Sequence, residues 1–271
     1  MTTTDPHIRA GCQWCQASTT AGATACPTCG APLDGAPLHT VSGWRASPKI
    51  KDHTSIRFGT GSGLAVEGDI VPSVELVLDP SDGMMFHHHR LLWKEHHLPL
   101  TATRTGGSMI TLMGEMSRVM LSASGPGRLA VSHGQAGELV VLPVRPGQAI
   151  DVGEGSFLAA NHVLGYTIEK LQGSLRSKLR STEGFYMERF YATEWPGLLV
   201  LHAQGCAFER TLAQGEQLLV DPGAFLYKDH SVSFTTEKMD VTTGVMGWKG
   251  LFMMRVVGPG RVGIESGSMA D

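Results

Sequence analysis

Leu91-Leu92-Trp93-Lys94-Glu95-His96 is the first of three related stretches along this chain. The later copies read Phe157-Leu158-Ala159-Ala160-Asn161-His162 and Phe225-Leu226-Tyr227-Lys228-Asp229-His230. Each copy joins two apolar residues, two variable residues, an acidic or amide residue and a histidine. Turn glycines precede and Pro-Gly turns follow all three copies, at Gly83, Gly147, Gly215, Gly127, Gly197 and Gly260. These anchors recur every 63 to 70 residues, so the body consists of three similar units.

The apolar residues between the turns follow the pattern of β-strands. Val74, Leu76 and Leu78 alternate with other residues, as expected for a half-buried strand. Such short segments recur with turn signals between them, and 34 glycines and 14 prolines supply those turns. We therefore expect an all-β sandwich or prism whose three units are related by a pseudo-threefold axis. The expected body covers 44–271, with units at about 72–129, 130–197 and 198–266.

The composition is that of a globular protein, with 42% hydrophobic and 17% charged residues. A net charge of −3 gives no overall field that would attract nucleic acid, so no nucleic-acid partner is expected. No apolar run follows a basic start, and none approaches the length of a membrane-spanning helix. We expect a cytoplasmic protein, with a peripheral membrane contact left open.

Four of the five cysteines form two Cys-x-x-Cys pairs near the N-terminus. The pairs are Cys12 with Cys15 and Cys26 with Cys29. Two such pairs can hold one Zn²⁺ tetrahedrally, and a site with four sulfur ligands is structural because no position stays open. We expect a zinc ribbon at residues 1–34 and a linker at 35–43, the alternative being a redox-active dithiol. The fifth cysteine, Cys206, is expected to be a buried and inert thiol.

Twelve histidines raise the question of a catalytic metal. His87 and His89 lie on one face of an expected strand, and the spacing Gly83-x3-His87-x-His89-x5-Glu95 faintly resembles the first cupin motif. The region where the second cupin motif would lie carries no ligand histidine. The alternative to a binding protein is a cupin-like, metal-dependent small-molecule enzyme or sensor that uses His87, His89 and His96. The simpler interpretation is that these histidines pack or face solvent.

Two positions of the repeat carry polar side chains in every copy. The last position holds His96, His162 and His230. Three imidazoles brought together by a pseudo-threefold would suit zinc or iron, but turn histidines that bond to backbone are the preferred interpretation. The preceding position holds Glu95, Asn161 and Asp229. A shared polar position of this kind indicates turn chemistry rather than a catalytic pair.

Each unit also carries an insert, at about 105–120, 170–184 and 239–250. The first insert is rich in methionine, and the second has leucines four residues apart between cations. The apolar insert residues include Met109, Met113, Leu175, Leu179, Met246 and Trp248. Methionine-rich and amphipathic segments suit adaptable contact surfaces. We therefore expect the inserts to contact another subunit, a membrane or a partner protein.

Four motifs of the body occur together in a known family. They are the run Phe86–Glu95, the Gly-Pro-Gly-Arg turns, the run Pro196–His202 and the run Phe225–Asp229. With them, residues 44–266 resemble the Altered Inheritance of Mitochondria twenty-four family, some of whose bacterial members carry a similar N-terminal ribbon. The resemblance implies an all-β, pseudo-threefold body, similar to the tryptophan RNA-binding attenuation protein, that often forms trimers, and it gives no established catalytic residues to carry over. Mitochondrial members are associated with inner-membrane organisation. A similar fold does not imply RNA binding.

The function expected from the sequence is that of a non-enzymatic binding or scaffold protein with the zinc ribbon as a docking module. Its partner is expected to be another protein or a second copy of the chain, for example in a homotrimer. The only expected site residues are the four zinc ligands.

Removing those ligands tests the ribbon. We expect one Zn²⁺ per chain, and Cys12→Ser should release it and unfold the ribbon, because metal binding and folding are coupled in such sites. The β-body should stay folded, since its core is built from other residues. Metal analysis of the purified chain measures the zinc. An unchanged zinc content after serine replaces all four cysteines would contradict the assignment.

Overall fold

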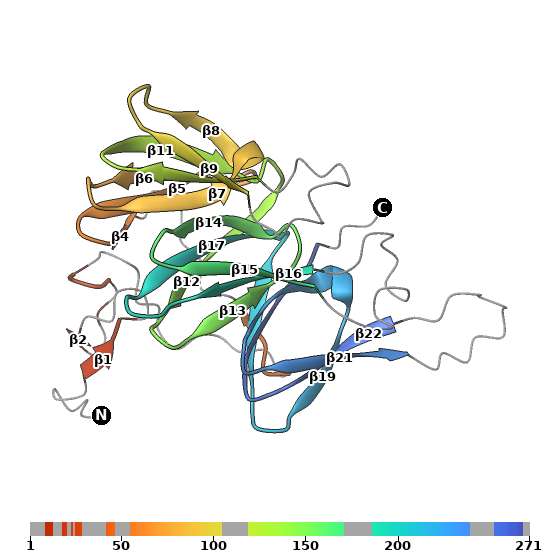
Figure 1. Cartoon of the computed structure of the whole chain (residues 1–271). Coiled ribbons are helices and arrows are strands. Elements are labelled where there is room, and N and C mark those ends of the chain that lie inside the picture. Colours follow the sequence, from red (N-terminus) through yellow and green to blue (C-terminus); the bar gives the residue numbers. More distant parts are fainter. Residues whose placement is uncertain are drawn as a thin grey trace.

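The computed structural model describes residues 9–12, 18–20, 23, 25–28, 42–46, 55–104, 119–170, 186–238 and 252–267. Antiparallel strands make up most of these residues and form several sheets (Figure 1), which confirms the all-β expectation. Within the same ranges, no helix is long and apolar enough to cross a membrane. The insert residues Met109, Met113, Leu175, Leu179, Met246 and Trp248 lie outside the described residues.

The body contains three units of six strands, and we name the six positions A to F in chain order. The first unit comprises β6 (Ser73–Leu78), β7 (Gly83–His87), β8 (Leu91–Lys94), β9 (Leu100–Arg104), β10 (Val119–Ser124) and β11 (Gly127–Ser132). The second comprises β12 (Gly137–Val144), β13 (Ala149–Val152), β14 (Phe157–Asn161), β15 (Gly165–Lys170), β16 (Tyr186–Tyr191) and β17 (Gly197–Gln204). The third comprises β18 (Ala207–Leu212), β19 (Gln217–Val220), β20 (Phe225–Asp229), β21 (Ser233–Lys238), β22 (Phe252–Val257) and β23 (Gly260–Glu265). Strand β17 thus closes the second unit, whereas the boundaries expected from the sequence place most of it in the third.

Shorter elements lie around these units. Strands β4 (Ser55–Phe58) and β5 (Ser62–Glu67) extend the sheet beyond β6, and β3 (Arg45–Ala46) pairs with β18. Near the N-terminus, β1 (Arg9–Gly11) pairs with β2 (Ser18–Thr20). The 3₁₀ turns η1 (His88–Arg90) and η4 (Pro222–Ala224) join strands B and C of the first and third units.

The same strand pairs occur in all three units. Strand A pairs with F, F with C, B with E, and E with D, always antiparallel. Strand C shifts register at the same place in each copy, at Leu92, Leu158 and Leu226. The repeated sequence therefore gives a repeated topology that includes the position of a β-bulge.

Successive units share sheets, because strand B of one unit pairs with strand C of the next. Strand β7 pairs with β14, and β13 pairs with β20. The register is the same at both junctions. At the first, Ala160, the fourth residue of the repeated stretch, lies opposite Met85, and at the second, Lys228, in the same position of its stretch, lies opposite Asp151. The resulting sheets have the orders β12-β17-β14-β7-β10-β9 and β15-β16-β13-β20-β23-β18-β3.

The series of units is open at both ends. Strand β8, the C strand of the first unit, is the last strand of the sheet β4-β5-β6-β11-β8. Strand β19, the B strand of the third unit, begins the sheet β19-β22-β21. Pairing of β8 with β19 would have closed the expected prism within one chain. Instead, the described residues form an open series in which the first and last units lie apart (Figure 1).

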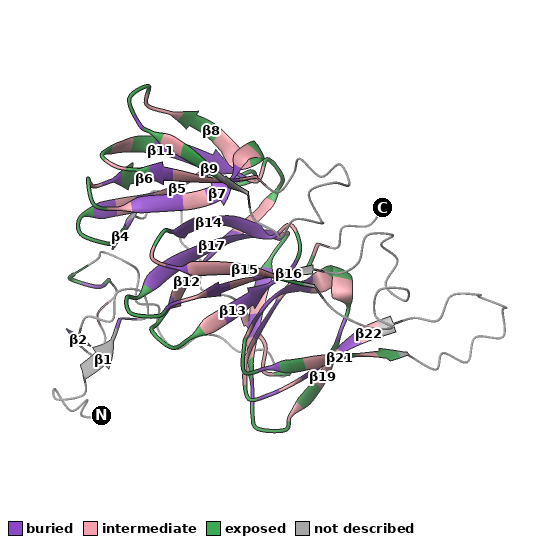
Figure 2. Cartoon of the chain, in the orientation of Figure 1, coloured by how far each residue is buried: buried purple, intermediate pink, exposed green. Residues whose placement is uncertain are grey.

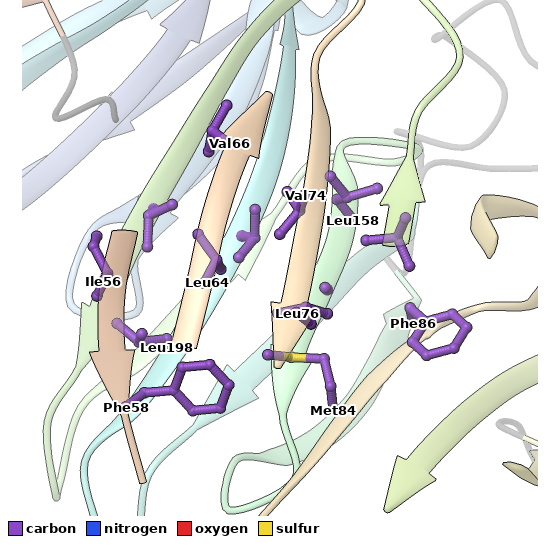
Figure 3. Packing of buried hydrophobic residues seen from close by; sticks show 14 of the residues in the cluster. Ile56, Phe58, Leu64, Val66, Val74, Leu76, Met84, Phe86, Leu158 and Leu198 are labelled. Atoms are coloured by element: carbon purple, nitrogen blue, oxygen red, sulfur yellow. The ribbon is translucent and has the colours of Figure 1, made fainter. Parts of the chain in front are cut away.

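Three apolar cores fill the spaces between the sheets. The first core holds Ile56, Leu64, Leu76 and Phe86 of the first unit and its preceding strands (Figure 3). It also receives Leu158 and Leu198 from the second unit, whose strands β14 and β17 are buried along their lengths (Figure 2). The second core lies mainly within the second unit and receives Leu226 and Tyr227 from the third. Each of these two cores is therefore completed by the unit that follows.

The third core receives no such side chains within the described residues. Its buried members are Met187, Leu212, Val220, Phe225, Val232, Met254, Val256 and Val262, all but Met187 from the third unit. At the other end of the series, Leu92 is 56% exposed, although its counterparts Leu158 and Leu226 are fully buried. The exposure of the bulge leucine thus depends on whether a preceding unit lies beside its strand.

Alanine substitution at two copies of this position tests the repeat. Leu158→Ala should cost about 2–5 kcal/mol of unfolding free energy, because it leaves a cavity in the first core. Leu92→Ala, at the same repeat position but exposed, should change the stability of the monomer by less than about 0.5 kcal/mol. Urea unfolding at low protein concentration measures both. If Leu158→Ala and Leu92→Ala lowered the unfolding free energy equally, the two positions would not differ in burial.

Candidate functional site

The acidic or amide residue of the repeat has a structural role in all three units. Glu95 Oε2, Asn161 Oδ1 and Asp229 Oδ2 accept hydrogen bonds from the backbone N–H groups that follow the Pro-Gly turns. The donors are Arg128, Leu198 and Arg261, at distances of 2.9, 2.8 and 2.8 Å. Each side chain therefore holds the turn between strands E and F, and the interpretation as turn chemistry is confirmed.

The repeated histidines do not form a common site. His96, His162 and His230 are exposed, one in each unit. The backbone N–H of His162 donates to Gly83 O, and that of His230 donates to Ala149 O, at 3.1 and 2.9 Å. These bonds continue the pairing between strands C and B of neighbouring units.

His87 and His89 lie close to each other, but not to His96. Their ring centroids are 5.6 Å apart, and His87 Nε2 lies 3.1 Å from Glu188 Oε1. The whole of β8 separates them from His96, which lies in the turn after that strand. No three metal-ligating side chains come together in the part of the chain that the structure describes. The cupin-like alternative therefore gains no support from the geometry.

Arg90 joins the first unit to the second just before β8. Its Nη1 donates to His133 O at 2.9 Å and its Nη2 donates to Gly155 O at 3.2 Å. The rings of His133 and His202 stack beside it, with centroids 4.2 Å apart. Their Nε2 atoms lie 3.0 and 3.1 Å from the carbonyl oxygens of Gly155 and Gln135, so these nitrogens carry the protons.

Both stacked histidines favour the neutral form. Burial lowers the pKa of His133 to about 4, with further contributions from His202 and Arg90. Burial also lowers the pKa of His202, and the positive charge of Arg90 lowers it further. Near neutral pH both histidines are therefore uncharged, and Arg90 is the positively charged residue of the cluster.

Two further networks surround buried carboxylates. Asp151 on β13 is bound by Arg189 and by Lys228, whose Nζ lies 2.6 Å from Oδ2. Burial alone would raise the pKa of Asp151, but the hydrogen bond from Arg189 and the charge of Lys228 lower it. The carboxylate is thus held ionised across the junction between β13 and β20.

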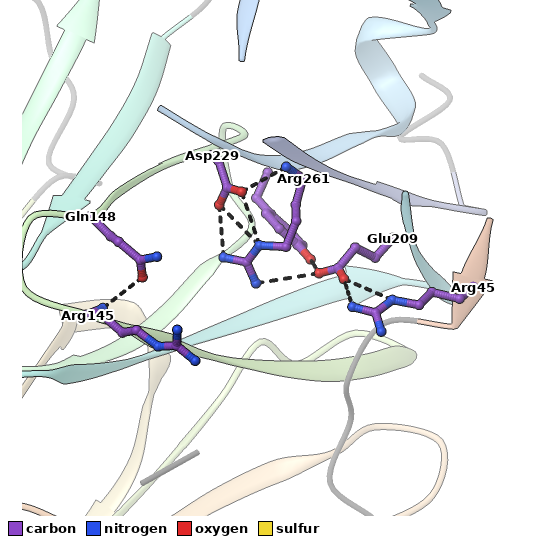
Figure 4. Close-up of polar contacts among 7 residues, drawn as sticks. Arg45, Arg145, Gln148, Glu209, Asp229 and Arg261 are labelled. Atoms are coloured by element: carbon purple, nitrogen blue, oxygen red, sulfur yellow. Dashed lines mark hydrogen bonds and ion pairs between the residues drawn. The ribbon is translucent and has the colours of Figure 1, made fainter. Parts of the chain in front are cut away.

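Glu209 on β18 is the second buried carboxylate (Figure 4). It accepts hydrogen bonds from Arg45 and from the hydroxyl group of Tyr227. Arg261 lies between two acids, with Nη1 3.7 Å from Glu209 Oε2 and Nη2 2.9 Å from Asp229 Oδ1. Arg45, Arg261 and the Tyr227 hydroxyl group therefore engage both carboxylates within the fold, which compensates for the burial of Glu209.

The cysteine prediction falls partly outside the described residues. Cys12 and Cys26 are buried, whereas Cys15 and Cys29 are not described. Cys12 directly follows β1, which pairs with β2. The zinc site stays a prediction. Cys206 is exposed, so the expectation of a buried thiol is wrong: it lies in the turn between β17 and β18.

The open edges β8 and β19 carry three of the exposed large apolar side chains among the described residues, the others being Ile70, Val71, Val77 and Trp195. On β8, Leu92 and Trp93 are 56% and 44% exposed, while the corresponding strands β14 and β20 are buried almost throughout (Figure 2). On β19, Leu219 is 39% exposed, while the corresponding β7 and β13 are mostly buried. The sequence signal was present, because all three copies of the stretch begin with two apolar residues. The sequence does not indicate which of the three strands lacks a neighbouring strand at its edge.

Comparison with known protein families gives a match for most of the sequence. A family model described as mitochondrial biogenesis AIM24 matches residues 64–267, which is most of the chain. The chain belongs to this family. The AIM24 match runs from β5 to just beyond β23 and so covers all three units.

The AIM24 chain also resembles a solved structure. The crystal structure of protein SPYM3_0169 from Streptococcus pyogenes superposes with a TM-score of 0.60 at 16% sequence identity. The similar region covers 77% of this chain and 94% of the streptococcal chain, which shows a shared fold. A search of curated proteins gave no match.

Acidification should destabilise the fold through the stacked histidines. An ordinary histidine has a pKa of 6.5 and His133 has about 4 in the folded chain, so the unfolded chain binds the proton first. This contribution to stability is complete above the ordinary pKa and is lost as the pH falls towards 4. The amide of glutamine can still donate to Gly155 O. Between pH 7.5 and 5, the His133→Gln variant should therefore lose less unfolding free energy than the unmodified chain.

Urea unfolding at several pH values measures the effect. His162→Gln, at an exposed histidine, is the matched control and should follow the unmodified chain. If His133→Gln and His162→Gln lost the same unfolding free energy on acidification, His133 would not be the cause of the acid destabilisation.

Proposed function

We propose that this AIM24 protein is a non-enzymatic binding or scaffold protein whose contact surfaces are the two open strand edges, β8 and β19. The observation that carries the proposal is that, among the described residues, these are the one C strand and the one B strand without the neighbour found in the other units. An open edge presents unpaired backbone N–H and C=O groups, and a partner strand can bind by extending the sheet. Exposed Leu92, Trp93 and Leu219 supply apolar contact area at these edges.

The polar clusters favour binding over catalysis. Asp151 and Glu209 are bound by cations, and Glu95, Asn161 and Asp229 hold turns. The stacked histidines use one ring nitrogen each to hold backbone carbonyl groups. A catalytic acid or base would need a side chain that can reach a substrate, and these side chains are engaged in holding the fold.

The predicted zinc ribbon fits the same role as a docking module. In that role Cys12, Cys15, Cys26 and Cys29 would be the ligands of a structural Zn²⁺ site, with Cys12 directly after β1. We propose a cytoplasmic location, and a peripheral membrane contact through the inserts stays a second use of the same scaffold.

Matched tryptophan substitutions test the use of the edges. Trp93→Lys places a charge on the open edge of β8, whereas Trp195→Lys changes a 68% exposed tryptophan in the turn between β16 and β17. The unmodified chain, isolated gently from its own cells, should be part of a complex larger than the monomer. Trp93→Lys should reduce its size to that of the monomer, and Trp195→Lys should not, because a buried cation opposes strand pairing.

Light scattering after size-exclusion chromatography gives the masses. Hydrogen exchange adds a direct reading, since the amide groups of β8 and β19 should exchange slowly in the complex and quickly in the Trp93→Lys variant. A complex that survives Trp93→Lys with fast exchange at both edges would contradict the proposal.

A further inference from the structure

We propose that binding at the open edge β8 is controlled by pH: the stacked rings of His133 and His202 hold the beginning of β8 in place, and protonation of these rings releases it. This inference rests on the proposed function and deepens it by naming how binding at β8 is regulated. Strand β8 is the last strand of its sheet as the structure describes it (Figure 1). Its position therefore depends on its pairing with β11 and on the turn η1 that precedes it.

Two residues attach this end of β8 to the second unit. Arg90 comes directly before β8, and His133 directly follows Ser132, the last residue of β11. Arg90 donates to His133 O at 2.9 Å and to Gly155 O at 3.2 Å, and His133 Nε2 lies 3.0 Å from the same Gly155 O. The ring of His133 stacks on that of His202 in β17, with an angle of 9° between the planes. We call Arg90, His133, Gly155 and His202 the junction cluster.

The junction cluster has no acceptor for a second proton on either ring. Each ring already carries a proton on Nε2, because both Nε2 atoms lie within 3.1 Å of backbone carbonyl oxygens. A further proton has to bind at Nδ1, and Nδ1 of His133 and of His202 is buried without a hydrogen-bond partner in the described part of the chain. A buried charged N–H group without an acceptor is costly. Protonation therefore favours a form in which the cluster is open and the rings reach water.

The charges around the rings act in the same direction. The titratable and charged groups of the surrounding segments are Arg90 and His89 of η1, Glu188 of β16, and Glu154, which is exposed in the turn before β14. After burial, His202, Arg90 and His89 are the groups that oppose a charge on His133. Arg90 also opposes a charge on His202. Glu188 favours the charged forms of Arg90 and His89, so the cation of the cluster is retained while its rings stay neutral.

The size of the effect follows from the pKa of His133. Burial, His202 and Arg90 lower this pKa to about 4 in the closed cluster, against 6.5 for an ordinary histidine. The ratio of open to closed forms should therefore be roughly thirtyfold higher at pH 5 than at pH 7.5. The depressed pKa of His202 adds to this change. The closed form has its full advantage above pH 6.5 and loses it as the pH falls towards 4.

Opening of the junction cluster weakens the support of the binding edge. Leu91, the first residue of β8, pairs with Val131 and packs against the first core. This pair lies directly beside Arg90 and His133, so it is the first part of the β8–β11 pairing to lose its attachment. A partner strand that extends the sheet needs β8 to stay extended along its length. Acidification should therefore release a partner from β8.

Hydrogen exchange of the purified chain tests the opening. After correction for the intrinsic effect of pH on exchange, the amide groups of residues 91–94 that bond to β11 should lose about thirtyfold in protection between pH 7.5 and 5. Residues 198–201, in the middle of a sheet, should stay better protected at both pH values. His133→Gln keeps a donor for Gly155 O but takes up no proton, so its loss of protection at 91–94 should be much smaller.

Three further variants make the exchange experiment specific. His202→Gln, which keeps a donor for Gln135 O, tests the other ring of the stack and replaces His133→Gln if that variant fails to fold. His89→Gln changes the neighbouring exposed histidine of η1, and His162→Gln changes an exposed histidine of the second unit. Both controls should follow the unmodified chain. Circular dichroism checks that each variant is folded.

The complex isolated from cells tests the control of binding. Light scattering after size-exclusion chromatography should give the mass of the complex at pH 7.5 and that of the monomer at pH 5. The complex formed by His133→Gln should keep its mass at pH 5, because the cluster of this variant takes up no proton at residue 133. The complex formed by His162→Gln should dissociate like that of the unmodified chain.

The outcomes separate this inference from the proposed function. Opening at 91–94 and dissociation at pH 5 that are both suppressed by His133→Gln support the regulation by pH. Equal loss of protection at 91–94 in the unmodified chain and in His133→Gln, or an opening suppressed only by His89→Gln, overturns it. A complex that dissociates with Trp93→Lys but keeps its mass at pH 5 overturns only this inference. A complex that survives Trp93→Lys overturns the proposed function, and with it the control of binding at β8.

Discussion

Pairing between strand B of one unit and strand C of the next is the interaction on which the structure depends. A single unit has two small half-sheets whose inner edges, B and C, are unpaired. The next unit supplies the missing neighbour and also places a bulge leucine in the core. Backbone pairing and core completion therefore occur together, and each junction stabilises the two units that it joins. The same dependence leaves the outer units incomplete in an isolated chain.

Sharing a sheet between units also explains a change in sequence pattern along the chain. Strands β5 and β6 face only one core, and their buried residues alternate with more accessible ones. Strands β12 and β17 lie between two cores: Leu139 and Val141 face the first, whereas Val140 and Leu142 face the second. A strand with apolar neighbours on both faces needs a continuous apolar run instead of alternation. The run 198–201 has the same cause.

Buried polar residues show how the repeat keeps a role while its chemistry changes. Ser132, His202 and Glu265 occupy one position of strand F, and each binds backbone in, or immediately before, the link that leads into a strand A. Their partners are Pro72 O, Gln135 O and Gln204 N. Glu265 has only one such bond, and burial raises its pKa to about 7. A perturbed pKa at a repeated structural position thus has a packing cause and does not by itself mark an active site.

The sequence by itself determined that three similar β units follow one another, and the turn role of Glu95, Asn161 and Asp229, because these features depend on spacing and local hydrogen bonding. Only the tertiary structure decided that Leu158 is buried while Leu92 is exposed, and that Arg90 and Asp151 connect successive units. The residue pattern of a strand states which face is apolar, but not whether another strand lies beside its edge. That depends on the place of each unit in the series, which is a property of the assembled chain.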